Sequence, residues 1–321
     1  MRLGAVIPCF RQERFLPRTL AALERALAGV PWQGVVVVSG GAPDVVTAGA
    51  SWRLLCPPAG AAPTPGGARM LGCAAVEGEL VLFVDADTEV DADWVARALA
   101  RAAEPSRVAG WGGRLEERVI DGVRDWAGVP DLNHTGDAER DVELLTTPVL
   151  YRRDALLAVG GYDPRLAAEE DFELALRFRA AGWTLRVLPG PAARHWNGPR
   201  PSVAELRRRW AHGLVFGPGQ ALRLYLGRRG FARLLWRQRL MLATLAFWTW
   251  GGAAALAVVL GAGPLALRAW ALALLALLAA LAVRKRSLRL AAYALLAWTV
   301  NGLGVVIGFL RGPVRPAAGN A

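Results

Sequence analysis

The sequence predicts an α/β domain with a mixed, mainly parallel sheet, followed by amphipathic helices and C-terminal transmembrane helices. Strand-like and helix-like segments alternate through the first 205 residues, which is typical of a parallel sheet covered by helices on both faces. Three long apolar stretches follow residue 239. The charge changes between these two parts, because all 27 Asp and Glu lie at or before Glu205, whereas 16 Lys and Arg follow it.

The N-terminal elements follow from local patterns. Residues 3–10 are a continuous apolar run and predict a buried strand, and residues 13–29 have apolar positions at helical spacing up to Gly29. Residues 91–103 predict a helix with Asp91 as its N-cap. The remaining expected elements are strands at 34–41, 52–56 and 79–87 and a helix at 66–78.

The C-terminal part predicts a membrane protein. Residues 203–239 alternate arginine with apolar and aromatic residues, which indicates one or two amphipathic helices on the inner leaflet, or else a basic juxtamembrane linker. Each apolar stretch approaches the ~20 residues that cross a bilayer. The three expected spans cover 240–262, 265–283 and 290–310, and two spans plus a re-entrant or interfacial segment is the alternative. The predicted domains are thus 1–205, 206–239 and 240–321.

The basic residues indicate the orientation. They precede the first span and separate the second from the third, so the positive-inside rule places them, with the N-terminal domain, in the cytoplasm. We expect a multi-pass protein of a bacterial-type inner membrane. The tail after the third span would then lie outside, and its two arginines count against that span. The sequence pI of 10.9 suggests nucleic acid, but basic residues interleaved with long apolar runs favour a membrane surface instead.

The compartment is expected to be reducing. The three cysteines have no disulfide or metal spacing. The chain opens directly into a strand-like run, and we identify no signal peptide.

Polar residues follow two of the predicted strands, at Ser39 and at Asp85-Ala86-Asp87. Ligands of such sheets bind beyond the carboxyl ends of the strands. Asp85 and Asp87 are two apart on an extended chain, so both carboxylates can point at one target, and hard oxygen ligands suit Mg²⁺ or Mn²⁺. On this triplet alone, a solvated strand end is the competing interpretation.

Three sequence blocks give the triplet a context. They are VIPCFRQERFLPRTL, GGARMLGCAAVEGELVLFVDADTEV and VGGYDPRLAAEEDFELALRFRAAGW, in this order. Together they resemble family 2 glycosyltransferases of the GT-A fold, over about residues 3–215. The resemblance implies transfer of a sugar from a nucleotide-diphosphate sugar with inversion at the anomeric carbon. It favours a UDP-sugar as the donor and implies Mg²⁺ or Mn²⁺ as the metal cofactor. A cytoplasmic domain followed by C-terminal spans is similar to enzymes of exopolysaccharide and glycolipid assembly, which implies a lipid-linked or polyisoprenoid-type acceptor.

The resemblance also implies roles for the acids. Asp87 would coordinate the metal on the donor diphosphate, and Asp85 would contact the ribose or the water shell of the metal. Asp171 matches the general base that takes the proton of the acceptor hydroxyl, and Glu170 would orient it. Acids stabilised by a helix N-terminus are the structural alternative for this pair.

Other positions match the donor and acceptor sites of the family with varying completeness. Arg69 matches a basic donor position, or else is a surface arginine of an amphipathic helix. His195 matches a histidine near the metal or diphosphate, or else is structural. In RRRW, residues 207–210, Arg209 would reach the diphosphate and Trp210 would contact an acceptor ring. Leu206 stands where the Q-x-x-R-W element has glutamine, so the element is incomplete. An interfacial basic helix is the alternative interpretation. The remaining donor-binding candidates are Pro8, Arg11, Glu13 and Ser39.

Two departures leave the nucleotide open and motivate the rivals. The family ends its second strand with Asp, where this chain has Ser39, and has Asn after the first aromatic, where this chain has Arg11. One alternative is a processive polysaccharide synthase, against which three spans and the incomplete Q-x-x-R-W element count. The other is a non-catalytic membrane scaffold that keeps the fold. The polar residues 112–147 are expected to form acceptor-side loops, and residues 146–162 a strand and short helix lining the acceptor site.

Overall fold

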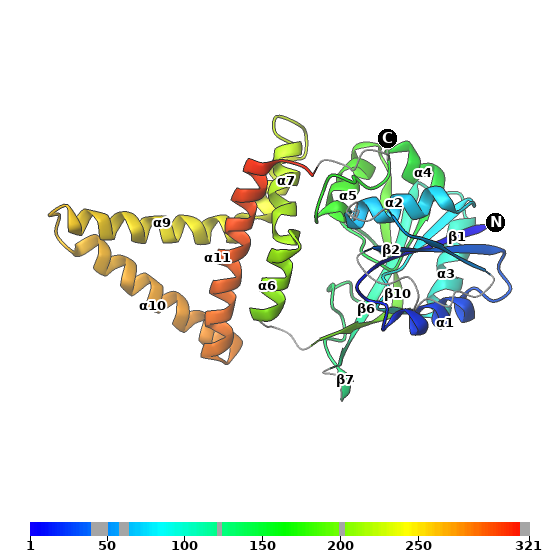
Figure 1. Cartoon of the computed structure of the whole chain (residues 1–321), viewed down its shortest axis with the longest axis horizontal. Helices are drawn as coiled ribbons and strands as arrows, with labels where there is room; N and C mark the ends of the chain where they lie inside the picture. The colour runs from blue at the N-terminus through cyan, green and yellow to red at the C-terminus, as the bar shows by residue number, and fades with distance from the viewer. Residues whose placement is uncertain (40–50, 58–63, 121–123, 199–202, 315–321) are drawn as a thin grey trace. The chain divides into compact units, whose positions relative to one another are not determined.

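The computed structural model describes residues 1–39, 51–57, 64–120, 124–198 and 203–314 (Figure 1). The chain divides into two compact units, one of Met1–Pro199 together with the chain after Pro313, and the other of Arg200–Pro313. The second unit thus holds the predicted basic segment and the predicted membrane region as far as Pro313.

Ten strands of the described residues form one mixed sheet in the first unit. The strand order is β3-β2-β1-β4-β9-β6-β10-β5, with β7 paired to β6 and β8 paired to β10. The first four strands of this path are parallel, as are the long neighbours β6 and β10. The strands are β1 Leu3–Phe10, β2 Trp32–Ser39, β3 Trp52–Leu55, β4 Leu80–Phe83, β5 Thr88–Val90, β6 Val108–Ile120, β7 Asp125–Ala127, β8 Arg140–Val142, β9 Val149–Arg152 and β10 Thr184–Asn197.

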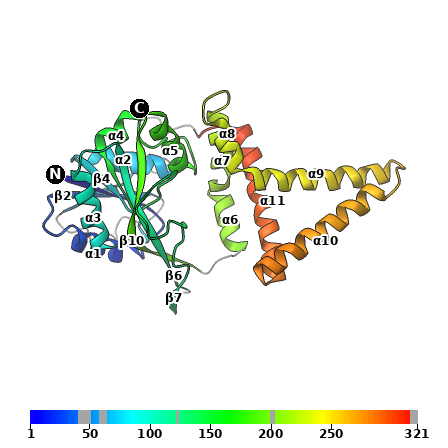
Figure 2. The same ribbon diagram turned by 180° about the vertical axis from the view of Figure 1, so that it is seen from behind.

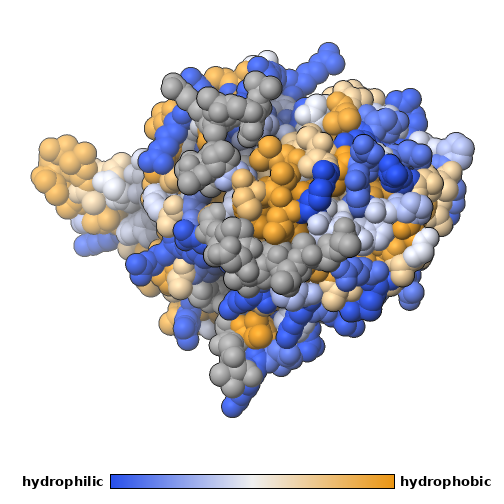
Figure 3. All heavy atoms as spheres, turned by 45° about the vertical axis from the view of Figure 1, so that its right-hand side comes forward, coloured by the Kyte–Doolittle hydropathy of each residue, from blue (hydrophilic) through white to orange (hydrophobic). Residues whose placement is uncertain are grey.

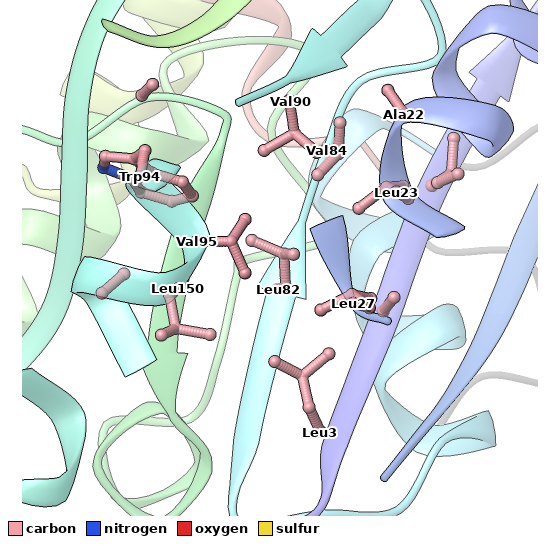
Figure 4. Close-up of a cluster of buried hydrophobic side chains, with 14 of the residues drawn as sticks. Leu3, Ala22, Leu23, Leu27, Leu82, Val84, Val90, Trp94, Val95 and Leu150 are labelled. Carbon is pink, nitrogen blue, oxygen red and sulfur yellow. The ribbon is translucent and has the colours of Figure 1, made fainter. Parts of the chain in front are cut away.

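Helices cover both faces of the sheet and produce two hydrophobic cores. One core joins α1 and α3 to one face of β1 and β4, and Figure 4 shows its packed Leu23, Leu82 and Trp94. The other joins α2, α4 and α5 to the opposite face. Alternate residues of β4 enter the two cores, so its hydrophobicity is continuous. The helices are α1 Leu16–Ala26, α2 Pro65–Ala75, α3 Ala92–Ala103, α4 Arg153–Ala158 and α5 Glu170–Ala180.

Most predicted N-terminal elements are present, with bounds that agree or differ by a few residues. Asp91 caps α3, since its carboxylate accepts a hydrogen bond from the Trp94 backbone N–H at 2.9 Å. The expected loop at 112–147 is wrong for its first part, because residues 112–120 belong to the long strand β6. β6 and β10 pair in parallel over most of their length and extend the sheet beyond the α/β core.

The second unit is helical in its described residues. Residues 203–239 contain three α-helices and a 3-10 turn, more than the one or two helices expected. The three apolar helices that follow are each long and apolar enough to cross a membrane. The elements are α6 Val203–Ala211, η2 Leu214–Phe216, α7 Gly217–Leu224, α8 Phe231–Arg237, α9 Arg239–Val259, α10 Leu265–Lys285 and α11 Leu288–Arg311.

Glycines hold α11 close to η2 and α7. A Cβ on Gly304 would lie 2.5 Å from the Val215 carbonyl oxygen, and one on Gly308 would lie 2.1 Å from that of Phe216. Gly219 of α7 approaches the Val305 carbonyl oxygen in the same way. Gly304 and Gly308 are one helical turn apart, so they form a flat strip on which the two short elements pack.

Candidate active site

Side chains from five elements meet at the carboxyl edge of the parallel strands. β1 and β4 run parallel with Val6 opposite Phe83, and polar residues follow the end of each strand. α2 contributes Arg69, the N-terminus of α5 contributes Glu170 and Asp171, and β10 contributes His195. The topology brings residues that are more than 100 positions apart to one edge of the sheet.

Arg69 is the centre of this cluster. Its Nη1 donates to Glu170 Oε1 at 2.6 Å and its Nη2 donates to Asp85 Oδ1 at 3.1 Å. Asp171 Oδ1 lies 3.8 Å from the same Nη1, and the guanidinium stands over the Tyr162 ring. Arg69 is only 5% exposed, so the interpretation as a surface arginine is wrong.

Asp171 is held in an acidic and largely buried place. Burial raises the pKa of Asp171 to about 7, Arg69 opposes this, and Glu170 and Asp85 add to it. Its Oδ1 is buried and accepts no hydrogen bond within the described residues. A carboxyl with a pKa near neutrality can accept a proton and release it at physiological pH, as a general base must.

Asp85 and Asp87 have separate partners. The Thr147 hydroxyl donates to Asp85 Oδ2, which with Arg69 occupies both oxygens of that carboxylate. Gln12 donates to Asp87 Oδ2. His195 Nε2 lies 3.3 Å from the other Asp87 oxygen, Oδ1. The two acids lie at the same edge of the sheet, but Asp85 pairs with Arg69, whereas Asp87 faces His195.

A chain of buried polar groups stands behind His195. The amide nitrogen of Asn197 lies 2.6 Å from His195 Nδ1 and donates to Glu117 Oε1 at 3.2 Å. Glu117 Oε2 accepts from the Val129 backbone N–H. Asn197 and Glu117 are each 7% exposed. The contact between Asn197 and Nδ1 therefore holds the imidazole ring in place beside Asp87.

Comparison with known families identifies this arrangement. The model of the glycosyl transferase family group 2 matches residues 80–310, and that of glycosyl transferase family 2 matches residues 5–124. The first match covers most of the chain.

The chain belongs to glycosyl transferase family group 2.

Solved structures of glycosyltransferases share the fold of this family 2 member. A mannosyltransferase from Pyrobaculum calidifontis, solved in complex with GDP-Man and Mn²⁺, is 19% identical over 94% of this chain and 86% of its own, with a TM-score of 0.59. S. aureus TarS is 17% identical over 73% of this chain and 68% of its own, with a TM-score of 0.50. The fold is therefore GT-A. No curated protein matches the sequence.

The residues around Asp87 fit a metal that the substrate helps to bind. Asp87 Oδ1 is buried, accepts no hydrogen bond within the described residues and faces His195. No three His, Cys, Asp or Glu side chains converge on one point in the described ranges. Mg²⁺ sites are often of this kind, because one or two carboxylates and the phosphates of the substrate share the ion.

The remaining predicted donor residues lie in two places. Ser39 ends β2 opposite Phe10 of β1, at the carboxyl edge and nearly buried. Arg11, the residue after Phe10, has a left-handed backbone with a φ of 56°. The Oε1 atom of Glu13 is buried and has no hydrogen bond among the described residues. Pro8 lies in β1 opposite Val37. Arg209 and Trp210 belong to α6 in the second unit, where Trp210 contacts the Phe216 ring edge-on at 5.3 Å.

Sequence reasoning missed four residues of the cluster. Gln12 and Thr147 bind the two aspartates, and Asn197 and Glu117 support His195. A polar residue directly after the first strand is a usable signal for Gln12. Asn197 is two residues from His195, so on an extended chain it shares the same face. We find no sequence signal for Thr147 or Glu117.

Proposed function

We propose that the protein is a membrane-anchored, metal-dependent, inverting glycosyltransferase that moves a sugar from a nucleotide-diphosphate sugar to a lipid-linked acceptor. The observation that carries the proposal is the cluster around Arg69. It holds a carboxyl with a pKa near 7, Asp171, at the same sheet edge as the partly unsatisfied carboxylate of Asp87. Family membership supplies the reaction class.

In the proposed reaction, Asp171 accepts the proton of an acceptor hydroxyl as that oxygen attacks the anomeric carbon of the sugar. The bond from that carbon to the diphosphate oxygen breaks on the opposite side, the nucleoside diphosphate leaves, and the configuration inverts. Arg69 pairs with Glu170 and Asp85 beside Asp171, so it keeps the base in its place and limits the rise of its pKa that burial causes.

Asp87 and His195 are the residues that would hold the metal, Mg²⁺ or Mn²⁺. A bound divalent cation would neutralise the charge that develops on the departing diphosphate. Gln12 holds one Asp87 oxygen and leaves the other directed toward His195. Ser39, Arg11, Glu13 and Pro8 at the neighbouring strand ends are the proposed donor-side residues, and the nucleotide base is not assigned.

The lipid acceptor is supported by a groove in the second unit. It has a volume of about 400 Å³, which is within the range of small-molecule sites. Its lining is apolar apart from one arginine, and it consists of Val203, Leu206, Arg207, Trp210, Leu296, Val300 and Leu303. An apolar chain with an anionic head matches such a lining, and Trp210 would contact the acceptor there. The membrane helices would keep the enzyme at the bilayer, with the N-terminal unit in the cytoplasm.

The test uses the full-length protein in detergent with Mn²⁺ and a panel of UDP- and GDP-sugars. Calorimetry measures donor binding, and product analysis measures transfer to a prenyl phosphate. Asp87→Asn is expected to lose metal-dependent donor binding, whereas Asp171→Asn is expected to bind donor but not to transfer. Unchanged activity in both variants would refute the proposed roles.

The same assay separates the two alternative functions. A ladder of product lengths would indicate a processive polysaccharide synthase, whereas one added sugar supports the proposal. A scaffold that only keeps the fold would bind no nucleotide sugar with any metal.

A further inference from the structure

The packing of α11 differs from that of a third helix in a membrane bundle. α9 and α10 form a hairpin, Arg239–Lys285, and α11 lies across its open end rather than along it (Figures 1 and 2). The contacts agree, because α11 meets residues of the first half of α9. The Trp248 indole donates to Thr299, and Gly302 faces Met241 and Leu245.

The closed end of the hairpin is apolar and uncovered. Leu256, Val259, Leu260 and Leu265 are 58–81% exposed. Figure 3 shows the apolar surface that results. α9 and α10 have 21 residues each, about 31 Å of helix, which matches a hydrocarbon core of ~30 Å.

α11 has two different sides. Leu303, Val306 and Leu310 follow Thr299 by four, seven and eleven residues, so they lie on the side that meets α9. Val306 and Leu310 are 42% and 76% exposed, whereas Leu303 and Leu296 line the groove with α6. Gly304 and Gly308 lie on the other side, against η2 and α7. α11 therefore packs on η2 and α7 with one side, while the apolar side that carries Val306 and Leu310 is exposed beyond its contact with α9.

The arginines of α6 decide how α11 lies. Leu296, Val300 and Leu303 form one groove with α6, so α6 runs beside the middle of α11. If α11 crossed the bilayer, Arg207, Arg208 and Arg209 of α6 would be placed at the depth of the hydrocarbon core. Charged side chains are strongly unfavourable there.

Most other basic residues of the second unit lie at the open end of the hairpin or at the two ends of α11. Arg239 begins α9, Arg284 and Lys285 end α10, Arg289 lies in the first turn of α11, and Arg311 is its last residue. The Arg311 guanidinium stands 4.7 Å from the centre of the Phe216 ring in η2. Of the basic residues from 207 to 311, only Arg268 lies near the closed end of the hairpin.

We propose that only α9 and α10 cross the membrane and that α11 lies in the cytoplasmic interface, with Val306 and Leu310 toward the bilayer, η2 and α7 on its cytoplasmic side and α6 along its flank. The chain after Arg311 then stays on the same side as the N-terminal unit. This arrangement removes the conflict with the positive-inside rule that a third span creates, because both ends of α11 are basic.

Cysteine labelling tests this topology without any enzymatic assay. Cys9 and Cys73 are buried and Cys56 is exposed, so Cys56→Ser gives a background with little reactivity. In that background, Val314→Cys reports on the chain after α11, and Ala262→Cys reports on the hairpin turn. The unsubstituted protein, through its native Cys56, marks the side of the N-terminal unit. A membrane-impermeant maleimide is applied to spheroplasts and to inverted vesicles.

The expected result is that the Val314→Cys variant reacts from the same side as native Cys56 and that the Ala262→Cys variant reacts only from the opposite side. If the Val314→Cys variant were labelled from the same side as the Ala262→Cys variant, and native Cys56 from the other, the chain would have three spans and the proposal would be overturned. Labelling at all three positions from one side would show that the hairpin does not cross, which also overturns it. Neither outcome depends on whether sugar transfer is detected.

Discussion

At the scale of single residues, Asp171 should control the pH dependence of transfer. A base acts only when it is deprotonated, and burial raises the pKa of this carboxyl to about 7. We expect kcat/KM to rise as pH increases through about 7 and then to level. Asp171→Asn should lower kcat by roughly 10²–10⁴ and abolish this acidic limb, since the general base is lost. Asp93→Asn on the exposed surface of α3 is the control. A limb that persists in Asp171→Asn would assign the titration to another group.

Arg69 should affect both stability and the titration of Asp171. It is buried and pairs with Glu170 and Asp85, so Arg69→Gln leaves buried carboxylates without their cation. Losing one partner of a buried pair costs about 3–5 kcal/mol, which a thermal unfolding curve in detergent would detect. Because Arg69 lowers the pKa of Asp171, the acidic limb should move to higher pH. Arg101→Gln, which breaks only exposed ion pairs, should change neither measurement.

At the scale of elements, the glycines of α11 allow a comparison within the same unit. Gly308→Ala places a Cβ about 2 Å from the Phe216 carbonyl oxygen, so η2 must move away, and overpacking of this kind costs about 1–3 kcal/mol. Gly252→Ala in α9 meets no atom within 4 Å and gains helix propensity. We expect a lower melting temperature for the first variant and an equal or higher one for the second. Equal melting temperatures would mean that α11 is not packed on η2.

The elements that the sequence predicts well are those whose burial is simple. β1, β2 and β4 are continuous apolar runs, because both of their faces enter a core. β6 was missed in part because its period of two is interrupted. Leu115 and Val119 point inward, but Glu117 lies between them on the same side. That carboxylate is buried because Asn197 and the Val129 backbone bind it, and these partners are distant in sequence.

The same limit applies to the candidate site. Asp85, Asp87 and Asp171 could be predicted, since strand ends and a sequence resemblance mark them. Which residues satisfy each carboxylate could not, because Gln12, Thr147 and Arg69 reach them only through the packing of β1, β4, β9 and α2. Likewise, α11 has the length and composition of a membrane span. Its contact with α6 and η2, which changes that interpretation, depends on tertiary structure.

At the scale of the whole molecule, the division of charge predicts a dependence on anionic lipid. The chain after Glu205 carries 16 Lys and Arg and no acid, and a basic segment at a membrane surface attracts anionic headgroups by about 1 kcal/mol per residue. Lipid that binds the folded protein stabilises it. We expect phosphatidylglycerol to raise the melting temperature in mixed micelles more than phosphatidylcholine does, with a difference that shrinks as salt increases.

Two matched variants locate the source of this stabilisation. Arg228→Gln with Arg229→Gln removes two charges from the turn between α7 and α8, and should reduce the phosphatidylglycerol effect. Arg25→Gln with Arg53→Gln removes two charges from the N-terminal unit, and should leave the effect unchanged because that unit carries all 27 acids except Glu205 and is not basic overall. If both double variants lost the effect equally, the attraction would follow from net charge alone. The helices of the second unit would then have no specific role in recognising the membrane surface.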